Sequence, residues 1–450
     1  MKNRMRSKVY SPVLVGIVLA LITGCSDDFF DTTAGDRITP DQHYKTLTDG
    51  EISVIGAIAT LQEAMPRLIL LDGLRSDILD VTPNAGASLR EINEQVFSPG
   101  NSYTDPADLY KVVINLNEVL ANVDKVAAND REFDEYIAHY VKGGLLSMRA
   151  WTYLTLVRLY DQAALITDNL TTLPENLEQN ILGREAMIDT LINQLLPYVF
   201  DASVGTERIE LQISYYVNTK ALLGELYLEK NDYANAVAYL KLACESYLNQ
   251  PSVLKVDNTY RNEAWSAIFL NAESAGVENL CVIPFSSVED QRNPLASHFG
   301  YRFQYTVKPS SVLVDSFMAQ IPSAGPAGDL YRGKGITFGV DSSAMGSGNY
   351  TYITKYEIDK NDPFSSDIVI SRAADLHLML AEAYNRLGDE QSQAYALIFL
   401  NQGVNKENPK PPEYARWSRN LGIRGRVNLT PLEVPEDLTG EDRIRYIEDL

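Results

Sequence analysis

The stretch from residue 215 to residue 243, YYVNTKALLGELYLEKNDYANAVAYLKLA, decides the fold of this chain. Apolar residues recur in it every three or four positions on both sides of Lys230-Asn231-Asp232, which is the spacing of an amphipathic helix. We therefore predict two helices joined by a tight turn. Gly224 and Ala236 have small side chains, so the two helices of such a hairpin can approach each other closely.

The same stretch partly matches the tetratricopeptide-repeat pattern. The matching positions are Leu223-Gly224, Tyr227, Ala236, Leu240 and Ala243. Lys220 stands where the pattern has a leading Trp, and the closing Pro is absent. Residues 372–403 look like a second unit, with a turn at Gly388-Asp389. Two units so far apart indicate helical hairpins interrupted by other material rather than a continuous solenoid.

Helical periodicity also dominates the first half of the chain, whereas the segment after the first hairpin is rich in Gly, Pro, Ser, Asn and aromatic residues. Long irregular segments on a rigid frame are where binding residues usually lie. We predict a mainly α protein in which an irregular, loop-rich region containing short strands is inserted into a scaffold of tetratricopeptide-like hairpins. The hairpins are expected near 107–160, 215–243 and 372–403, the loop-rich ligand region at 245–365, and strands near 279–285 and 350–356.

The first 24 residues have the pattern of a secretory signal peptide. A basic head is followed by an apolar run, Val13–Ile22, that is too short to span a bilayer well. The run ends in Ile22-Thr23-Gly24-Cys25, and Cys25 occupies the position at which a bacterial lipoprotein signal requires cysteine. The alternative is an ordinary signal peptide in which this cysteine is incidental.

On the lipoprotein interpretation, Cys25 becomes the acylated first residue of the mature protein and anchors it in a membrane. Residues 25–45 then form a polar tether, and residues 46–450 form the folded body. Beyond Cys25 we find no apolar run long enough for a transmembrane helix. We expect Cys244 and Cys281 to be buried thiols rather than a disulfide.

The chain is strongly acidic, with a formal net charge of −21. Such a surface argues against binding nucleic acid or another polyanion through bulk electrostatics. The four histidines form no HExxH motif or close metal pair, and we expect no cofactor, no metal and no catalytic residues. Residues 328–335 nearly spell a P-loop, but Gly335 lacks the hydroxyl that would bind magnesium. A glycosidase carboxylate pair stays open in so acidic a chain.

Several motifs, met in order along the chain, carry a family resemblance. Residues 25–31 (CSDDFFD) approach a C-x-D-D-F-L-D start, and Tyr110, Ile114 and Asn117 follow a Y-x3-I-x2-N pattern. Further matches lie at 148–160, 215–243, 308–317, 372–384 and 422–428. Together they resemble the SusD/RagB-like nutrient-binding lipoproteins of the Bacteroidetes outer membrane.

This resemblance implies a non-enzymatic, glycan-binding lipoprotein on the outer membrane, facing the cell surface. Such a protein caps a TonB-dependent SusC-like transporter as a lid and hands over a captured oligosaccharide. Two features depart from the family pattern: Tyr103 lies near where a Trp often precedes the Tyr110 helix, and the late E-R-x2-E-L motif is missing. Because the chain stops within the amphipathic pattern of Ile444 and Ile447, we expect its C-terminus to be truncated.

Sugars present hydroxyl rims and flat C–H faces, so a binder needs aromatic platforms together with polar hydrogen-bonding side chains. Two segments have this composition. The first candidate ligand contacts lie between residues 291 and 305: Arg292, Asn293, Phe299, Tyr301, Arg302 and Tyr305. The second set lies between residues 77 and 103: Asp77, Asp80, Asn84, Arg90 and Tyr103.

Each assignment has an alternative. The aromatic residues at 299, 301, 303 and 305 alternate, which fits equally a strand that buries one face. The segment from 77 to 103 is equally consistent with a solvated loop. Arg149, on an apolar helix, is expected to make an internal pair rather than a ligand contact. The competing functions are a repeat-type adaptor that binds a protein or peptide and a glycan-cleaving enzyme.

Overall fold

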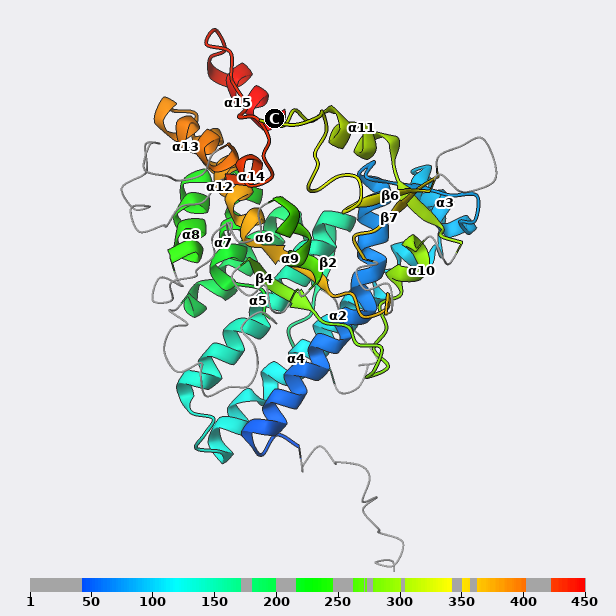
Figure 1. The fold of residues 1–450 in the computed structure, drawn as a ribbon. Coiled ribbons are helices and arrows are strands. Elements are labelled where there is room, and N and C mark those ends of the chain that lie inside the picture. The colour runs from blue at the N-terminus through cyan, green and yellow to red at the C-terminus, as the bar shows by residue number, and fades with distance from the viewer. Residues whose placement is uncertain are drawn as a thin grey trace, which may run out of the picture.

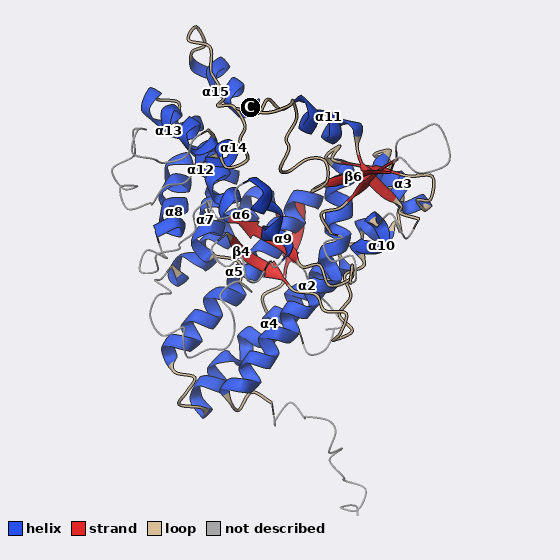
Figure 2. Cartoon of the chain, viewed as in Figure 1, coloured by secondary structure: helices blue, strands red, loops and turns tan. Residues whose placement is uncertain are grey.

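The structure is a computed structural model that describes residues 43–170, 180–199, 216–245, 262–270, 272, 278–300, 304–341, 350–356, 362–401 and 422–449. Helices dominate it, and the strands form short two-stranded sheets (Figures 1 and 2). The predicted fold class, mainly α with short strands in loop-rich regions, is therefore confirmed.

Three long helices form the first part of the frame and pack in sequence order (Figure 1). They are α2 (Leu47–Arg75), α4 (Ala107–Asn129) and α5 (Glu135–Tyr160). The apolar stripe of α4 is buried in the core, including Leu109, Val112 and Leu116. Asp134 caps α5 by accepting from the backbone N–H of Ile137 at 3.0 Å, which satisfies one of the unpaired donors at the helix start.

Helix α2 is more apolar than the sequence analysis allowed for. By length and composition alone it is able to cross a membrane, although more than half of its most apolar window is buried inside the protein. Its buried residues pack against α4, and its N-terminus carries a capping box between Thr46 and Asp49. These contacts are those of a core helix in a folded body.

The hairpins predicted at 215–243 and 372–403 are present and lie against each other. The first consists of α7 (Thr219–Glu229) and α8 (Tyr233–Glu245), and the second of α12 (Ala373–Leu387) and α13 (Glu390–Leu400). Helix α12 packs against α8, so these distant segments share one apolar cluster. Gly388 ends α12 with a φ of 79°, a left-handed conformation that glycine adopts without steric cost.

Shorter elements complete the frame. Helix α6 (Arg184–Leu195) packs against α5 and α7. Within the described residues, the remaining helices are α3 (Ala87–Asn93), η2 (Ser102–Thr104), η3 (Leu196–Tyr198), η7 (Asn262–Ser266), α9 (Ala267–Leu270), α10 (Leu295–Phe299), α11 (Ser311–Ala319), α14 (Gly422–Gly425) and α15 (Gly440–Asp449).

All the named strands pair antiparallel, and the described pairs join segments that are often far apart in the chain. The pairs are β1 (Leu79–Val81) with β5 (Val307–Pro309), β2 (Gln162–Leu165) with β3 (Asn180–Gly183), β4 (Asn279–Ile283) with β8 (Ile368–Arg372), and β6 (Phe338–Asp341) with β7 (Tyr350–Ile353). Strands β4 and β7 fall where the sequence predicted strands.

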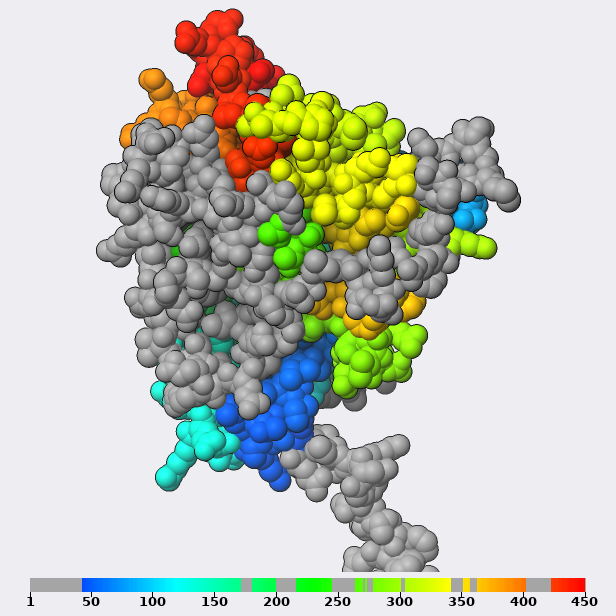
Figure 3. Space-filling view, viewed as in Figure 1, coloured from blue at the N-terminus to red at the C-terminus, as the bar shows by residue number. Residues whose placement is uncertain are grey.

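Further long-range backbone contacts hold the C-terminal segment in place. Ser323 N donates to Asn428 O at 2.8 Å, and Thr430 N donates to Ile321 O at 2.9 Å. In the space-filling view the residues near 320 and the C-terminal residues lie side by side at the top of the molecule (Figure 3). The irregular region is thus tied to the last described helices.

Two predictions about single side chains are confirmed. Cys244 and Cys281 are both buried thiols, and burial raises the pKa of Cys281 to about 12, which keeps it protonated. Arg149 is internal: its guanidinium donates to Asn117 Oδ1 at 2.6 Å and to Gln194 Oε1 at 3.1 Å. Burial lowers the pKa of Arg149, and these amide oxygens compensate part of the lost hydration.

Gly224→Ala tests the close packing of the first hairpin. A Cβ at residue 224 would lie 2.7 Å from Leu240 Cδ2 and 3.2 Å from Leu240 N, so α7 and α8 must separate. We expect the free energy of unfolding in urea to fall by about 1–3 kcal/mol. Gly56→Ala is the control, because a Cβ there meets nothing within 4 Å and should stabilise α2 by about 0.5–1 kcal/mol. Equal effects of the two substitutions would contradict the packing argument.

Candidate functional site

The pairing of β1 with β5 brings the two predicted ligand-binding segments together. The register places Asp80 opposite Lys308 and Val81 opposite Val307. Hydrogen bonds extend the ribbon beyond the named strands: Thr82 N donates to Thr306 O at 2.9 Å, and Thr82 Oγ1 donates to Tyr305 O at 2.7 Å. Residues 82 and 305 are 223 positions apart, so this contact depends on the whole fold.

The other end of this ribbon is also fixed. Ser310 N donates to Ile78 O at 3.0 Å, and Ser310 Oγ donates to the carbonyl of Asp77. The same hydroxyl caps α11 by accepting from Leu313 N at 3.1 Å. Asp77 has a φ of 58°, a left-handed conformation that aspartate tolerates better than most residues. The backbone around Asp77 is therefore set by contacts at several points.

Asn101 attaches the loop that carries Tyr103 to α3. Its side chain is buried, and its Oδ1 accepts from Tyr103 N at 3.0 Å. Its Nδ2 donates to Ser88 O and to a carboxylate oxygen of Glu91, both at 3.0 Å. All the donors and one acceptor of the amide are thus used for structure, which predicts a fixed orientation of η2 against α3.

Arg67 of α2 holds the same loop from the other side. Its Nη1 donates to Tyr103 O at 3.1 Å and to the carbonyl of Asp105, and its Nε lies 3.2 Å from a carboxylate oxygen of Asp108. The ring of Tyr103 is half-buried against the core, and this burial raises the pKa of its hydroxyl. Tyr103 therefore has a positioned backbone and stays protonated at neutral pH.

The face formed by β1, β5, α3 and η2, here called the ribbon face, presents mixed chemistry. Asp77, Asn84 and Arg90 are exposed, whereas Tyr103 and Tyr305 are half-buried. Arg90 donates to the carbonyls of Ala85 at 2.9 Å and Pro83 at 2.7 Å and so shapes the turn after β1. A carboxylate, an amide, a guanidinium and two phenol rings thus lie on neighbouring elements.

Asp80 has a structural role in this face. Its Oδ2 lies 3.2 Å from Lys308 Nζ on the paired strand, and its Oδ1 accepts from Val81 N at 2.8 Å. Both partners are partly exposed to solvent, so the ion pair contributes little beyond favouring this register. Asp80 therefore supports the face from within the ribbon.

Two predicted ligand contacts are wrong, because their side chains are fully buried. Asn293 donates to Ser366 O at 2.6 Å and accepts from Leu295 N at 3.0 Å, and Phe299 stacks on Tyr356 with ring centroids 5.5 Å apart. The alternation of aromatic residues did not indicate an exposed ring at Phe299. This residue lies at the end of the short helix α10, whose apolar residues face the core.

The remaining predicted residues lie elsewhere or outside the described part. Arg292 is exposed and lies over the ring of Phe364, with its guanidinium carbon 5.6 Å from the ring centroid. Tyr301, Arg302 and the proposed lipid anchor Cys25 fall outside the residues that the structure describes.

The sequence analysis missed residues that the structure places at the ribbon face. Val96 and Phe97 follow α3 and are 60% and 46% exposed, respectively. An aromatic residue in a polar stretch rich in turn residues, EQVFSPGN, was an available signal for Phe97. No comparable signal marks Asn101 or Arg67, since only the folded structure shows that their polar atoms position Tyr103.

Comparison with known proteins agrees with this architecture. No family model matches the chain. SusD-like protein P25 of Formosa agariphila is 25% identical over 439 residues, covering 87% of this chain and 80% of the relative. The crystal structure of a SusD superfamily protein from Bacteroides vulgatus superimposes with a TM-score of 0.68 at 17% identity, covering 90% of this chain and 84% of the other.

The NanU protein of Bacteroides fragilis gives a TM-score of 0.64 at 17% identity, over 92% of this chain and 87% of that one. The chain is therefore similar to SusD-like proteins over most of its length and has the fold of the solved SusD superfamily structures. The likeness to these two solved structures covers 90% and 92% of this chain.

Asn101→Ala tests how the SusD-like frame positions Tyr103. The substitution removes two hydrogen bonds to α3 and one to the backbone of η2, so we expect a loss of about 1–3 kcal/mol in unfolding free energy. Amide hydrogen exchange at Tyr103 should become faster. Asn115→Ala on α4 is the matched control, since that side chain bonds only its own helix, at Lys111 O. Unchanged exchange at Tyr103 would show that Asn101 does not hold the loop.

Proposed function

We propose that this SusD-like protein is a non-catalytic glycan-binding protein that captures an oligosaccharide on the ribbon face. One observation carries the proposal. Two segments selected separately for sugar-binding composition meet through the hydrogen bonds of β1 with β5. Their meeting supports a single composite site built from both.

The side chains on this face suit neutral sugars. The rings of Tyr103 and Tyr305, together with exposed Phe97, offer flat apolar surface for C–H faces. Asp77 and Asn84 are exposed and able to hydrogen-bond hydroxyl groups. Hydrogen bonds hold the backbone at Asp77, Tyr103 and Tyr305, so little ordering would be needed there when a ligand binds.

The absence of catalysis is part of the proposal. A glycosidase needs two carboxyl groups that flank the scissile bond. On the ribbon face, Asp80 is paired with Lys308 and accepts a backbone N–H, so its oxygens are engaged in structure. This arrangement supports binding over hydrolysis at this face.

We further propose that Cys25 is acylated, that the protein lies at the outer surface of the outer membrane, and that it closes over a TonB-dependent SusC-like transporter. The signal-like residues 1–24 and the similarity to SusD-like proteins support this assignment. The alternative adaptor role gains less support, because α8 and α12 pack against each other and bury the surfaces that the two hairpins turn toward one another.

Affinity electrophoresis against neutral and acidic polysaccharides tests the binding role. We expect at least one glycan to retard the protein without releasing product. Tyr103→Ala and Tyr305→Ala should each weaken that retardation about tenfold, because each removes a ring that stacks on sugar. Tyr103→Phe keeps the ring and should retain most of the affinity.

Tyr233→Ala is the matched control, since Tyr233 begins α8 on the hairpin and bonds Asn231 there. It should leave retardation unchanged, and circular dichroism should show that each variant is folded. Retardation that survives loss of both rings would place the ligand elsewhere, and release of sugar product would establish an enzyme instead.

Cys25→Ala tests the anchor. When the protein is expressed in a bacterium fed an alkyne-tagged fatty acid, the native chain should incorporate the label and the variant should not. Cys244→Ala removes a buried thiol instead and should keep the label. Labelling of the Cys25 variant would mean that this cysteine is not the acylated residue.

A further inference from the structure

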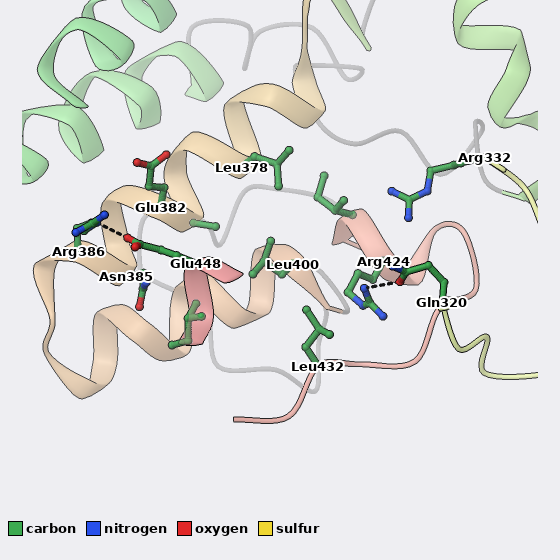
Figure 4. Close-up of a pocket in the computed structure, with 13 residues that line it drawn as sticks. Gln320, Arg332, Leu378, Glu382, Asn385, Arg386, Leu400, Arg424, Leu432 and Glu448 are labelled. Carbon is green, nitrogen blue, oxygen red and sulfur yellow. Dashed lines mark hydrogen bonds and ion pairs between the residues drawn. The ribbon is translucent and has the colours of Figure 1, made fainter. Parts of the chain in front are cut away.

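A separate pocket of about 560 Å³ lies at the opposite end of the irregular region, among α12, α14 and α15 (Figure 4). Its volume falls within the usual range for small-molecule sites. Two arginines and Gln320 lie at one end, leucine side chains lie in the middle, and two glutamates lie at the far end with Asn385 and Arg386 (Figure 4). This division of chemistry points to an elongated ligand with a charged end.

The cationic end consists of Arg332 and Arg424. Arg424 donates through Nε to Thr430 O at 3.0 Å and through Nη1 to Gln320 Oε1 at 3.1 Å. Arg332 donates through Nε to a carboxylate oxygen of Asp329 at 2.5 Å. A guanidinium has five N–H donors, so each arginine retains donors beyond these bonds. The buried carboxylate of Asp329 is ion-paired with Arg332, whereas Arg424 bonds neutral oxygens.

A bound anion would stabilise the charged form of Arg424. Burial, and then the neighbouring charge of Arg332, lower the pKa of Arg424. A carboxylate placed between the two guanidinium groups would replace lost hydration and offset their repulsion. The fixed orientation of Arg424, from its bonds to Thr430 and Gln320, favours such a ligand because little side-chain entropy remains to be lost.

The middle of the pocket is aliphatic. Leu378, Leu400 and Leu432 lie between the two ends (Figure 4), and Ile423 and Ile447 also line the pocket. None of the described residues that line it is aromatic, so it lacks the flat platform that a sugar ring prefers. An aliphatic body would bury well here, since each buried methylene contributes about 0.8 kcal/mol.

The far end is polar and partly acidic. Arg386 is ion-paired with Glu448, and Glu382 lies beside them (Figure 4). Burial, and then the charge of Glu448, raise the pKa of Glu382. A positively charged group at this end of a ligand would relieve the crowding of these two carboxylates.

We propose that this pocket binds an amphipathic carboxylate with an aliphatic body, its carboxylate between Arg332 and Arg424 and its chain along Leu378 and Leu400. The site is distinct from the ribbon face and does not depend on the glycan-binding role. Two sources share this chemistry: a free aliphatic acid, and the carboxyl end of a short apolar peptide whose ammonium group reaches Glu382.

Calorimetric titration of the purified protein with octanoate tests the site. We expect saturable one-to-one binding, and octanamide, which has the same length without the charge, should bind at least about tenfold more weakly. Arg332→Gln should weaken octanoate binding by a similar factor, and Arg332→Lys, which keeps the charge, should lose less.

Leu378→Glu is a second variant that does not disturb the arginines. Leu378 is 43% exposed on α12, so the substitution should fold normally while placing a negative charge beside the bound chain. Leu387→Glu, on the same helix and 40% exposed but outside the lining, is the matched control. Leu378→Glu should weaken octanoate binding about tenfold, and Leu387→Glu should not change it.

The tripeptide Ala-Leu-Leu distinguishes the two sources. If the pocket takes peptides, the tripeptide should bind more tightly than octanoate, and Glu382→Gln should weaken the tripeptide without weakening octanoate. If it takes free acids, octanoate should bind more tightly and Glu382→Gln should leave it unchanged or strengthen it. The proposal would be overturned if neither octanoate nor the tripeptide bound. It would also be overturned if the folded Arg332→Gln and Leu378→Glu variants bound octanoate as tightly as the native protein does.

Discussion

Strand β1 packs on helix α2, and the ribbon face depends on this contact. Strands β1 and β5 are each three residues long, and an isolated two-stranded ribbon of that size is marginal in water. Leu79 is buried against α2 at Gly73, where a Cβ would overlap the leucine side chain. The helix therefore provides the burial that the ribbon lacks, and a side chain at residue 73 would displace β1 and everything paired to it.

A buried ion pair fixes the packing of another part of the irregular region. Glu278 is fully buried, lies 3.0 Å from Arg426 and accepts Ala373 N at its carbonyl. Burying such a pair costs hydration that its attraction repays only when the geometry is good, so its value lies in fixing one arrangement. It holds the start of α12 next to the residue that follows α14, and both helices line the pocket around Arg424.

Local periodicity made the hairpins predictable, because each helix carries its own apolar stripe within a dozen residues. The ribbon was not predictable as a pairing, since three-residue strands have almost no local pattern and their partners are more than two hundred positions apart. Amino-acid composition nevertheless pointed to both segments, 77–103 and 291–305, as candidates for sugar binding. It failed for Phe299 and Asn293 because the same residue types serve a core and a sugar site equally well, and only burial distinguishes the two uses.

The strongly acidic surface is compatible with both proposed sites for a physical reason. Charges farther apart than about 8–10 Å are screened at physiological salt, so the net charge of −21 acts mainly on the approach of a ligand. Contacts within a few ångströms decide how long it stays. The net charge of the protein does not affect the binding of a neutral sugar at the ribbon face. A carboxylate is repelled by this net charge as it approaches, but it forms direct charge-assisted hydrogen bonds once it reaches Arg332 and Arg424. The net charge should therefore slow association at the pocket without preventing tight binding there.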